Sequence, residues 1–271
     1  MATADRTPSF SHRLSACTSG ILSNPRGFAL FLDVDGTLLD LAATPKSVRV
    51  PEGLIGVLQR LSLSFDGAIA IVTGRQISEI DLLLSPLKLT ASGVHGAEMR
   101  AAPERDIERV TATLPPDVVQ AMRKLSLAIP GVIAEPKGPG LAIHYRLAPD
   151  VGPEILSALE ASLEAHRGAL EILPGKRLFE VIPAGLSKGT ALASISKLQS
   201  FRGRVPIMIG DDIGDEAAFA VAEGLDGFGL RVAGERYGDD EADFAGPGSV
   251  VNWLDQLCHF LHRDHGLRAQ P

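Results

Sequence analysis

Two short acidic segments carry the side chains best suited to chemistry. Asp33 and Asp35 stand two residues apart in the first, and Asp211 and Asp215 stand four apart in the second. Carboxylates at close range cannot all stay ionised without a cation, because each raises the pKa of its neighbours. Carboxylate oxygens suit Mg²⁺, which also takes phosphate oxygens as ligands. If the fold brings the two segments together, they predict a magnesium-assisted reaction at a phosphate group.

Other polar groups in the sequence could hold that phosphate. Thr73 offers a hydroxyl and Gly74 an unobstructed backbone N–H at the end of an apolar run. Lys188 opens a helical pattern, directly after the expected N-cap residue Ser187. A lysine and a helix N-terminus both supply positive potential for phosphoryl oxygens. We therefore expect Thr73, Gly74 and Lys188 at the phosphate.

Short apolar runs precede these groups and must position them. Continuous apolar runs are typical of strands covered on both faces, and here they occupy residues 28–33, 68–73 and 206–210, with weaker candidates at 89–94 and 227–232. Helical patterns alternate with them at residues 51–63, 76–84, 188–198 and 250–262. The alternation predicts an α/β fold with a doubly wound parallel sheet, whose ligands bind at the carboxyl ends of its strands.

The middle of the chain has a different pattern, in which each of two helices is followed by a pair of short strands. Such a pattern favours an α+β unit with an antiparallel sheet. We therefore predict an inserted cap domain over residues 107–183. The core would comprise residues 25–106 and 184–266, and residues 1–24, which lack periodicity, would form a flexible tail.

Composition excludes several classes of function. The chain has 26 basic and 33 acidic residues, a net charge of −7, and only 5% aromatic residues, which argues against binding to nucleic acid or to a membrane surface. The first residues lack the apolar stretch of a secretory signal, so we expect a cytoplasmic protein. A calcium loop starting at Asp33 would need Gly and Glu where Leu38 and Thr44 stand.

Four motifs in this order resemble those of the haloacid-dehalogenase-like superfamily of phosphohydrolases; they occupy residues 33–37, 73–75, 188–189 and 210–216. The resemblance implies that Asp33 is a nucleophile that forms an aspartyl-phosphate, and that Asp35 is the general acid and base. It also implies that Asp211 binds Mg²⁺ together with Asp33 and the backbone carbonyl of Asp35. Whether Asp212 or Asp215 supports the metal through water stays open.

The inserted segment and its flanks are similar to the trehalose-6-phosphate phosphatase family at residues 93–98, 135–146 and 175–180. The resemblance spans about residues 28–262 and implies Mg²⁺-dependent hydrolysis of trehalose 6-phosphate. Gly214 departs from it, because the family usually has Thr there, but no metal ligand is lost. We expect six side chains of the cap to bind the sugar: Glu135, Lys137, His144, Arg146, Lys176 and Glu180. The alternative for each alone is a solvated strand face.

His95 lies between glycines after an expected core strand. Its side chain is expected either to contact substrate or to hold its own loop.

Other functions stay open from sequence alone. The chain could hydrolyse another sugar phosphate, such as sucrose phosphate or mannosyl-phosphoglycerate, or it could be a phosphomutase that returns the phosphoryl group to a sugar. A non-catalytic sensor would not need the intact set of Asp33, Asp35, Lys188 and Asp211. The expected ligand is a small sugar phosphate, and the resemblance implies a functional link to a trehalose-phosphate synthase.

Overall fold

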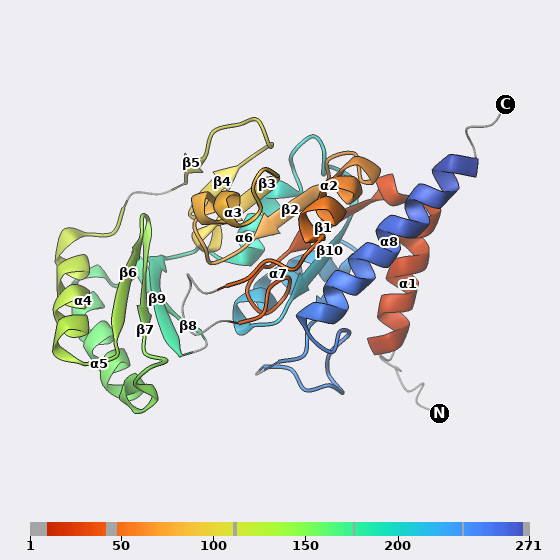
Figure 1. Cartoon of the computed structure of the whole chain (residues 1–271). Coiled ribbons are helices and arrows are strands. Elements are labelled where there is room, and N and C mark those ends of the chain that lie inside the picture. The colour runs from red at the N-terminus through yellow and green to blue at the C-terminus, as the bar shows by residue number, and fades with distance from the viewer. Residues whose placement is uncertain (1–9, 42–47, 111–112, 176, 235, 268–271) are drawn as a thin grey trace, which may run out of the picture.

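The computed structural model describes residues 10–41, 48–110, 113–175, 177–234 and 236–267, and these form two sheets with their helices (Figure 1). The larger sheet has seven strands, in the spatial order β11 (Phe228–Arg231), β10 (Val205–Gly210), β1 (Phe28–Leu32), β2 (Ile69–Val72), β3 (Thr90–Gly93), β4 (Glu98–Arg100) and β5 (Glu108–Arg109). The first five run parallel, and β4 and β5 are antiparallel additions at one edge.

Apolar side chains fix the centre of this sheet. β1 lies between β10 and β2, and its residues Leu30, Phe31 and Leu32 are fully buried. Burial on both faces explains why β1 and β2 are continuous rather than alternating apolar runs. The helices that accompany the sheet are α1 (Phe10–Ser23), α2 (Leu54–Ser64), α3 (Ile77–Leu83), α6 (Lys188–Ile195), α7 (Glu216–Gly224) and α8 (Pro247–Leu267). α8 packs on α1 and α2, and α6 packs on α7.

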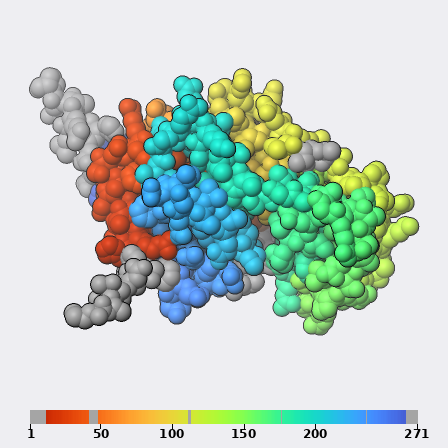
Figure 2. All heavy atoms as spheres, turned by 180° about the vertical axis from the view of Figure 1, so that it is seen from behind, coloured from red at the N-terminus to blue at the C-terminus, as the bar shows by residue number. Residues whose placement is uncertain are grey.

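The second sheet forms a separate unit, which we call the cap (residues 116–183). Its four antiparallel strands have the spatial order β6 (Ile133–Lys137), β7 (Gly140–His144), β9 (Leu178–Pro183) and β8 (Leu170–Gly175). Helices α4 (Pro116–Ala128) and α5 (Gly152–Leu163) pack on each other and enclose a hydrophobic core distinct from that of the larger sheet. Figure 2 shows the cap gathered at one end of the molecule. The prediction of an α/β core with an inserted α+β unit is confirmed.

Two predicted boundaries differ from the structure. The prediction of a flexible tail is wrong for residues 10–23, which form α1 and fully bury Cys17 and Ile21. These two side chains are four residues apart and so share one helix face, a stripe too narrow to stand out among the polar residues. At the other boundary, β5 still pairs with β4, so Glu108 and Arg109 belong to the larger sheet.

No helix in the described ranges combines the length and apolar character needed to cross a membrane.

Candidate active site

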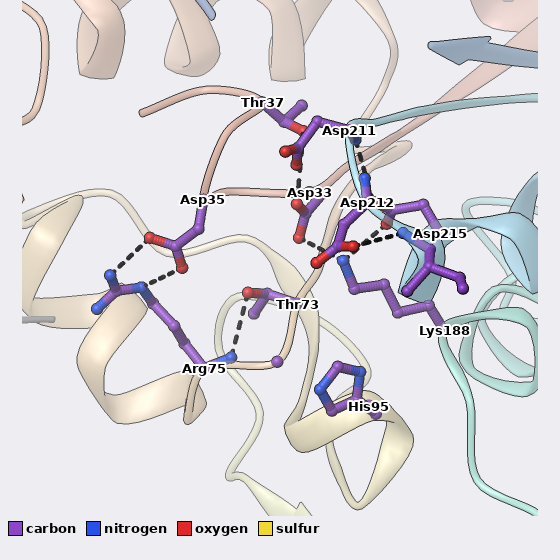
Figure 3. A network of polar contacts seen from close by, with 12 residues as sticks. Asp33, Asp35, Thr37, Thr73, Arg75, His95, Lys188, Asp211, Asp212 and Asp215 are labelled. Atoms are coloured by element: carbon purple, nitrogen blue, oxygen red, sulfur yellow. Dashed lines mark hydrogen bonds and ion pairs between the residues drawn. The ribbon is translucent and has the colours of Figure 1, made fainter. Parts of the chain in front are cut away.

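A buried ion-pair cluster lies at the carboxyl end of the central strands (Figure 3). Asp33 follows β1, and its Oδ1 lies 2.7 Å from Nζ of Lys188. The same Nζ donates a hydrogen bond of 2.7 Å to Oδ1 of Asp215. All three side chains are at most 5% exposed. Three motifs that lie far apart in sequence therefore meet at one ammonium group.

Local structure at the start of α6 explains the position of Lys188. The side chain of Ser187 accepts a hydrogen bond from the N–H of Thr190, and the Thr190 hydroxyl accepts one from the N–H of Ser187. This reciprocal cap fixes where the helix begins, as predicted from the sequence. Gly189 lets the helix approach its neighbour, since a Cβ there would lie 2.6 Å from the carbonyl oxygen of Ala217 on α7.

A third carboxylate completes the cluster. Asp211 directly follows β10, and one oxygen each from Asp33, Asp211 and Asp215 can be chosen so that all three lie within 4.8 Å of one another. The hydroxyl of Thr37 donates towards Asp211 at 3.3 Å and towards Asp33 at 3.4 Å. The backbone of Gly36 also packs against the carboxylate of Asp211. Gly36 has a φ of +83°, and a Cβ there would lie 2.1 Å from Oδ2 of Asp211. Only glycine fits this approach.

Burial and like charge perturb the ionisation of this cluster. Burial raises the pKa of Asp33 to about 7; Lys188 opposes the shift, and Asp215 and Asp35 add to it. Burial likewise raises the pKa of Asp215, against the opposing effect of Lys188. Burial alone would lower the pKa of Lys188, but Asp215 and Asp33 hold it above its ordinary value. One ammonium group thus pairs with two of the three clustered carboxylates, and a cation would relieve the remaining negative charge.

The donor set fits a hard divalent cation. Asp33 and Asp211 offer carboxylate oxygens beside the hydroxyl of Thr37, and glycine at position 36 lets the backbone pack against Asp211 without displacing its carboxylate. Asp215 is less suited to direct coordination, because its Oδ1 accepts from Lys188 and its Oδ2 accepts from the N–H groups of Asp211 and Asp212, both at 3.1 Å. The side chain of Asp212 accepts from the N–H of Ile213.

Asp35 is turned towards a different partner. Arg75 grips it with two hydrogen bonds of 2.6 Å, from Nε to Oδ2 and from an Nη to Oδ1. In Figure 3 this carboxylate points towards Arg75, away from the carboxylates of Asp33 and Asp211. The backbone N–H of Arg75 is held by the hydroxyl of Thr73 at 3.2 Å. The Thr73–Arg75 turn therefore determines where the side chain of Asp35 lies.

The cap sheet presents four of the six predicted sugar-binding residues on one face. Glu135 pairs across to Ala142, and Ala142 to Glu180, so these three positions form one row of the sheet. Lys137 and His144 are two residues from members of that row and share its face. His144 Nε2 lies 2.8 Å from Oε2 of Glu135. Lys176 lies outside the described residues, and Arg146 follows β7 in a partly buried position.

Glu180, Lys137 and His95 join the cap to the larger sheet. Lys137 Nζ donates to Oε1 of Glu180 at 2.8 Å and to the carbonyl oxygen of Gly74 at 3.2 Å. The other carboxylate oxygen of Glu180 pairs with Nε2 of His95. Burial alone would raise the pKa of Glu180, but His95 and Lys137 lower it well below its ordinary value. The sequence left two roles open for His95, contact with substrate and support of its own loop. The structure adds a third, a contact with the cap.

Two site residues were not nominated from the sequence. Arg75 stands in the Thr-Gly-Arg motif, but nothing in its spacing to Asp35 signals the two-pronged contact. Thr37 ends the first acidic motif, two residues after Asp35. A hydroxyl so close to two carboxylates in sequence does indicate a residue of the site. Both residues lie beside proposed catalytic carboxylates and were found only through their contacts.

Comparisons with known proteins point to one family. A family model described as trehalose-phosphatase matches residues 31–240. The probable trehalose-phosphate phosphatase of Sinorhizobium fredii is 40% identical over 222 residues, which cover 79% of this chain and 81% of that protein. The trehalose-6-phosphate phosphatase of Escherichia coli is 33% identical over 239 residues, covering 87% and 88%.

A solved structure supports the fold. The C-terminal domain of trehalose-6-phosphate phosphatase from C. albicans superposes with a TM-score of 0.74 and covers 89% of this chain and 96% of its own. Its sequence identity is 21%, so the likeness concerns the fold alone.

Proposed function

This chain belongs to the trehalose-phosphatase family of phosphoric monoester hydrolases, and we propose that it releases phosphate from trehalose 6-phosphate through an aspartyl-phosphate on Asp33. The observation that carries the proposal is the position of Lys188, which bridges Asp33 and Asp215 beside Asp211 at the strand ends. A buried ammonium group there can hold the nucleophile and attract the phosphoryl group of a substrate.

The proposed reaction has two steps. In the first, an oxygen of Asp33 attacks phosphorus, the bond to the sugar oxygen breaks, and Asp35 donates a proton to that oxygen. In the second, Asp35 takes a proton from water, the water oxygen attacks the same phosphorus, and the bond to Asp33 breaks to release phosphate. Both oxygens of Asp35 accept hydrogen bonds from Arg75. In each step, therefore, Asp35 must either rotate away from Arg75 or transfer the proton while one oxygen stays bonded to it.

We propose Mg²⁺ as the cofactor. Asp33, Asp211 and the backbone carbonyl of Asp35 would hold it, with Asp215 outside the inner sphere, where its hydrogen bonds hold Lys188 and the Asp211 loop. When bound, the cation supplies positive charge that offsets the negative charge of the phosphoryl oxygens. Thr73 and the N–H of Gly74 are proposed to bind those oxygens on the side of the Thr73–Arg75 turn.

The cap is proposed to select the sugar. The side chains of Glu135, Lys137, His144 and Glu180 share the face that meets the larger sheet, and Arg146 continues β7. Trehalose 6-phosphate is favoured over sucrose phosphate or mannosyl-phosphoglycerate, because the family model and both relatives carry trehalose-phosphate names. A phosphomutase is disfavoured for the same reason. We further propose a cytoplasmic location and a trehalose-phosphate synthase as the enzyme that supplies the substrate.

Phosphate release from a panel of sugar phosphates tests this function. We expect the highest kcat/KM with trehalose 6-phosphate, loss of activity in chelator and recovery with Mg²⁺ but poor recovery with Ca²⁺. Asp33→Asn should fold and be inactive, because an amide keeps the shape of the side chain but is not a nucleophile. Equal rates with all sugar phosphates would refute the substrate, and a folded, active Asp33→Asn variant would refute the covalent intermediate.

A further inference from the structure

The contact between His95 and the cap gives this histidine a role that substrate binding alone does not. We propose that His95 is a positioning residue: it anchors the Glu180–Lys137 pair of the cap on the Gly74 turn, so that sugar-binding and phosphate-binding groups are assembled as one unit. This inference rests on the proposed function for the identity of the sugar, but the contact itself belongs to the free protein.

The backbone of the His95 loop is bonded to the Thr73–Arg75 turn. The N–H of His95 donates to the carbonyl of Thr73 at 3.2 Å, and the N–H of Val94 donates to that of Arg75 at 3.0 Å. Val94 and His95 both have left-handed backbone conformations, with φ of 48° and 52°. This conformation is a genuine outlier for the β-branched Val94, although histidine adopts it more readily, and it persists where surrounding structure imposes it. The backbone that carries the imidazole is therefore held on the Thr73–Arg75 turn.

The imidazole lies directly on Gly74. A Cβ at position 74 would come within 2.6 Å of Nε2 of His95 and 3.5 Å of Oε2 of Glu180. A side chain at position 74 would therefore displace the ring from its contact with the cap. Glycine at position 74 thus serves two purposes, since it exposes a backbone N–H for phosphate and leaves space for His95.

Four groups close a ring between the two parts of the chain. His95 pairs with Glu180, Glu180 accepts from Lys137, and Lys137 donates to the carbonyl of Gly74, on which His95 lies. His95, Lys137 and Glu180 are each only 8% exposed. A buried carboxylate needs its partners, because water cannot replace them. Loss of His95 should therefore weaken the hold of the larger sheet on the cap.

This arrangement differs from the two roles that the sequence suggested for His95. A residue that only held its own loop would not reach a strand of the cap. A residue that only bound substrate would not need a partner in the free protein. It also changes the expectation for Glu180, whose truncation should disturb the Gly74 turn as well as sugar binding.

A distance measurement tests the anchor without any substrate. Labels on Leu127→Cys in the cap and Leu63→Cys on α2 use side chains that are 88% and 74% exposed. We expect energy transfer between the labels to fall in the His95→Ala variant, because the cap separates more often from the larger sheet. The control is His166→Ala, which removes a histidine 2.8 Å from Asp117 but within the cap. Unchanged transfer in the His95→Ala variant would overturn the proposal.

Kinetics provide the second arm. His95→Ala should lower kcat for trehalose 6-phosphate at least tenfold, whereas His95→Gln should recover most of it, because its amide nitrogen can reach Glu180. In a double-mutant cycle with Glu180→Gln, the combined loss should not exceed the larger single loss. Additive losses would overturn the proposal by showing that the two residues act separately. If the wild-type protein does not hydrolyse trehalose 6-phosphate, the proposed function fails, and the distance measurement still decides the anchor.

Discussion

Ionisation of Asp33 should make the stability of the metal-free protein fall as the pH rises. The carboxyl group has an ordinary pKa of 3.8 and a pKa of about 7 in the folded chain, chiefly through burial. Between these values the folded state holds a proton that the unfolded state has lost, so the free energy of unfolding decreases with increasing pH. Below pH 3.8 the contribution is fully present, and above about pH 7 it is lost.

The size of the effect follows from the same two values. Their difference, at 1.36 kcal/mol per pH unit, corresponds to about 4 kcal/mol, of which about 3 kcal/mol falls between pH 5 and pH 8. Asn is neutral at every pH and resembles protonated Asp33 in shape. We therefore expect Asp33→Asn in chelator to lose about 3 kcal/mol less than the wild-type protein between pH 5 and pH 8, as measured by urea unfolding.

Mg²⁺ provides the matched perturbation. The cation competes with the proton for Asp33, so it should stabilise the wild-type protein more at pH 8 than at pH 5. Asp33→Asn removes the competition and should gain less stability from Mg²⁺ at pH 8. The reasoning is refuted if wild type and variant show the same pH dependence in chelator, since the shift would then not arise from Asp33.

Three further changes test the surroundings of the site. Gly36→Ala should lower Mg²⁺ affinity in calorimetric titration, because its Cβ would lie 2.1 Å from Oδ2 of Asp211; unchanged affinity would exclude Asp211 as a ligand. Arg75→Lys keeps the charge but loses the two-pronged grip, so kcat should fall at least tenfold for trehalose 6-phosphate and less for p-nitrophenyl phosphate, whose leaving group needs less protonation. Equal losses for both substrates would contradict a role through Asp35. Ile21→Ala should cost about 2–5 kcal/mol in urea unfolding, whereas Leu127→Ala, at an 88% exposed position, should stay within about 0.5 kcal/mol; equal costs would mean that α1 does not pack as described.

The clustering of polar residues at the carboxyl end of the sheet could be predicted because its signals are local. Asp33, Thr73 and Asp211 each follow an apolar run, and parallel strands place such positions at one edge. Ser187 marks the start of α6 by its own side chain. In each case a few neighbouring residues determine the geometry, so sequence spacing is sufficient evidence.

The links between cap and larger sheet could not be predicted in this way. Glu180 lies 85 residues from His95 and Lys137 lies 63 residues from Gly74 along the chain, and neither contact follows from strand alternation. Alternation places Glu135 and Lys137 on one face, but it does not distinguish the partner of each. In the structure, Glu135 pairs with His144 inside the cap, whereas Lys137 reaches Gly74. Such contacts depend on how the cap and the larger sheet, each with its own hydrophobic core, meet.

The Thr73–Arg75 turn contacts both the residues at the strand ends, which the sequence predicts, and the cap, whose contacts it does not predict. Its hydroxyl and its glycine N–H are the groups that the sequence assigns to phosphate, its arginine grips Asp35, and its Gly74 carbonyl receives Lys137 from the cap. Three consecutive residues thus carry the proposed phosphate-binding groups, the contact with Asp35, the proposed general acid and base, and the contact with Lys137 of the cap. A movement of the cap that shifts Gly74 must also shift the neighbouring Arg75, and with it the carboxylate of Asp35. If the cap selects the sugar and Asp35 is the proton donor, as proposed, we expect this turn to couple the two.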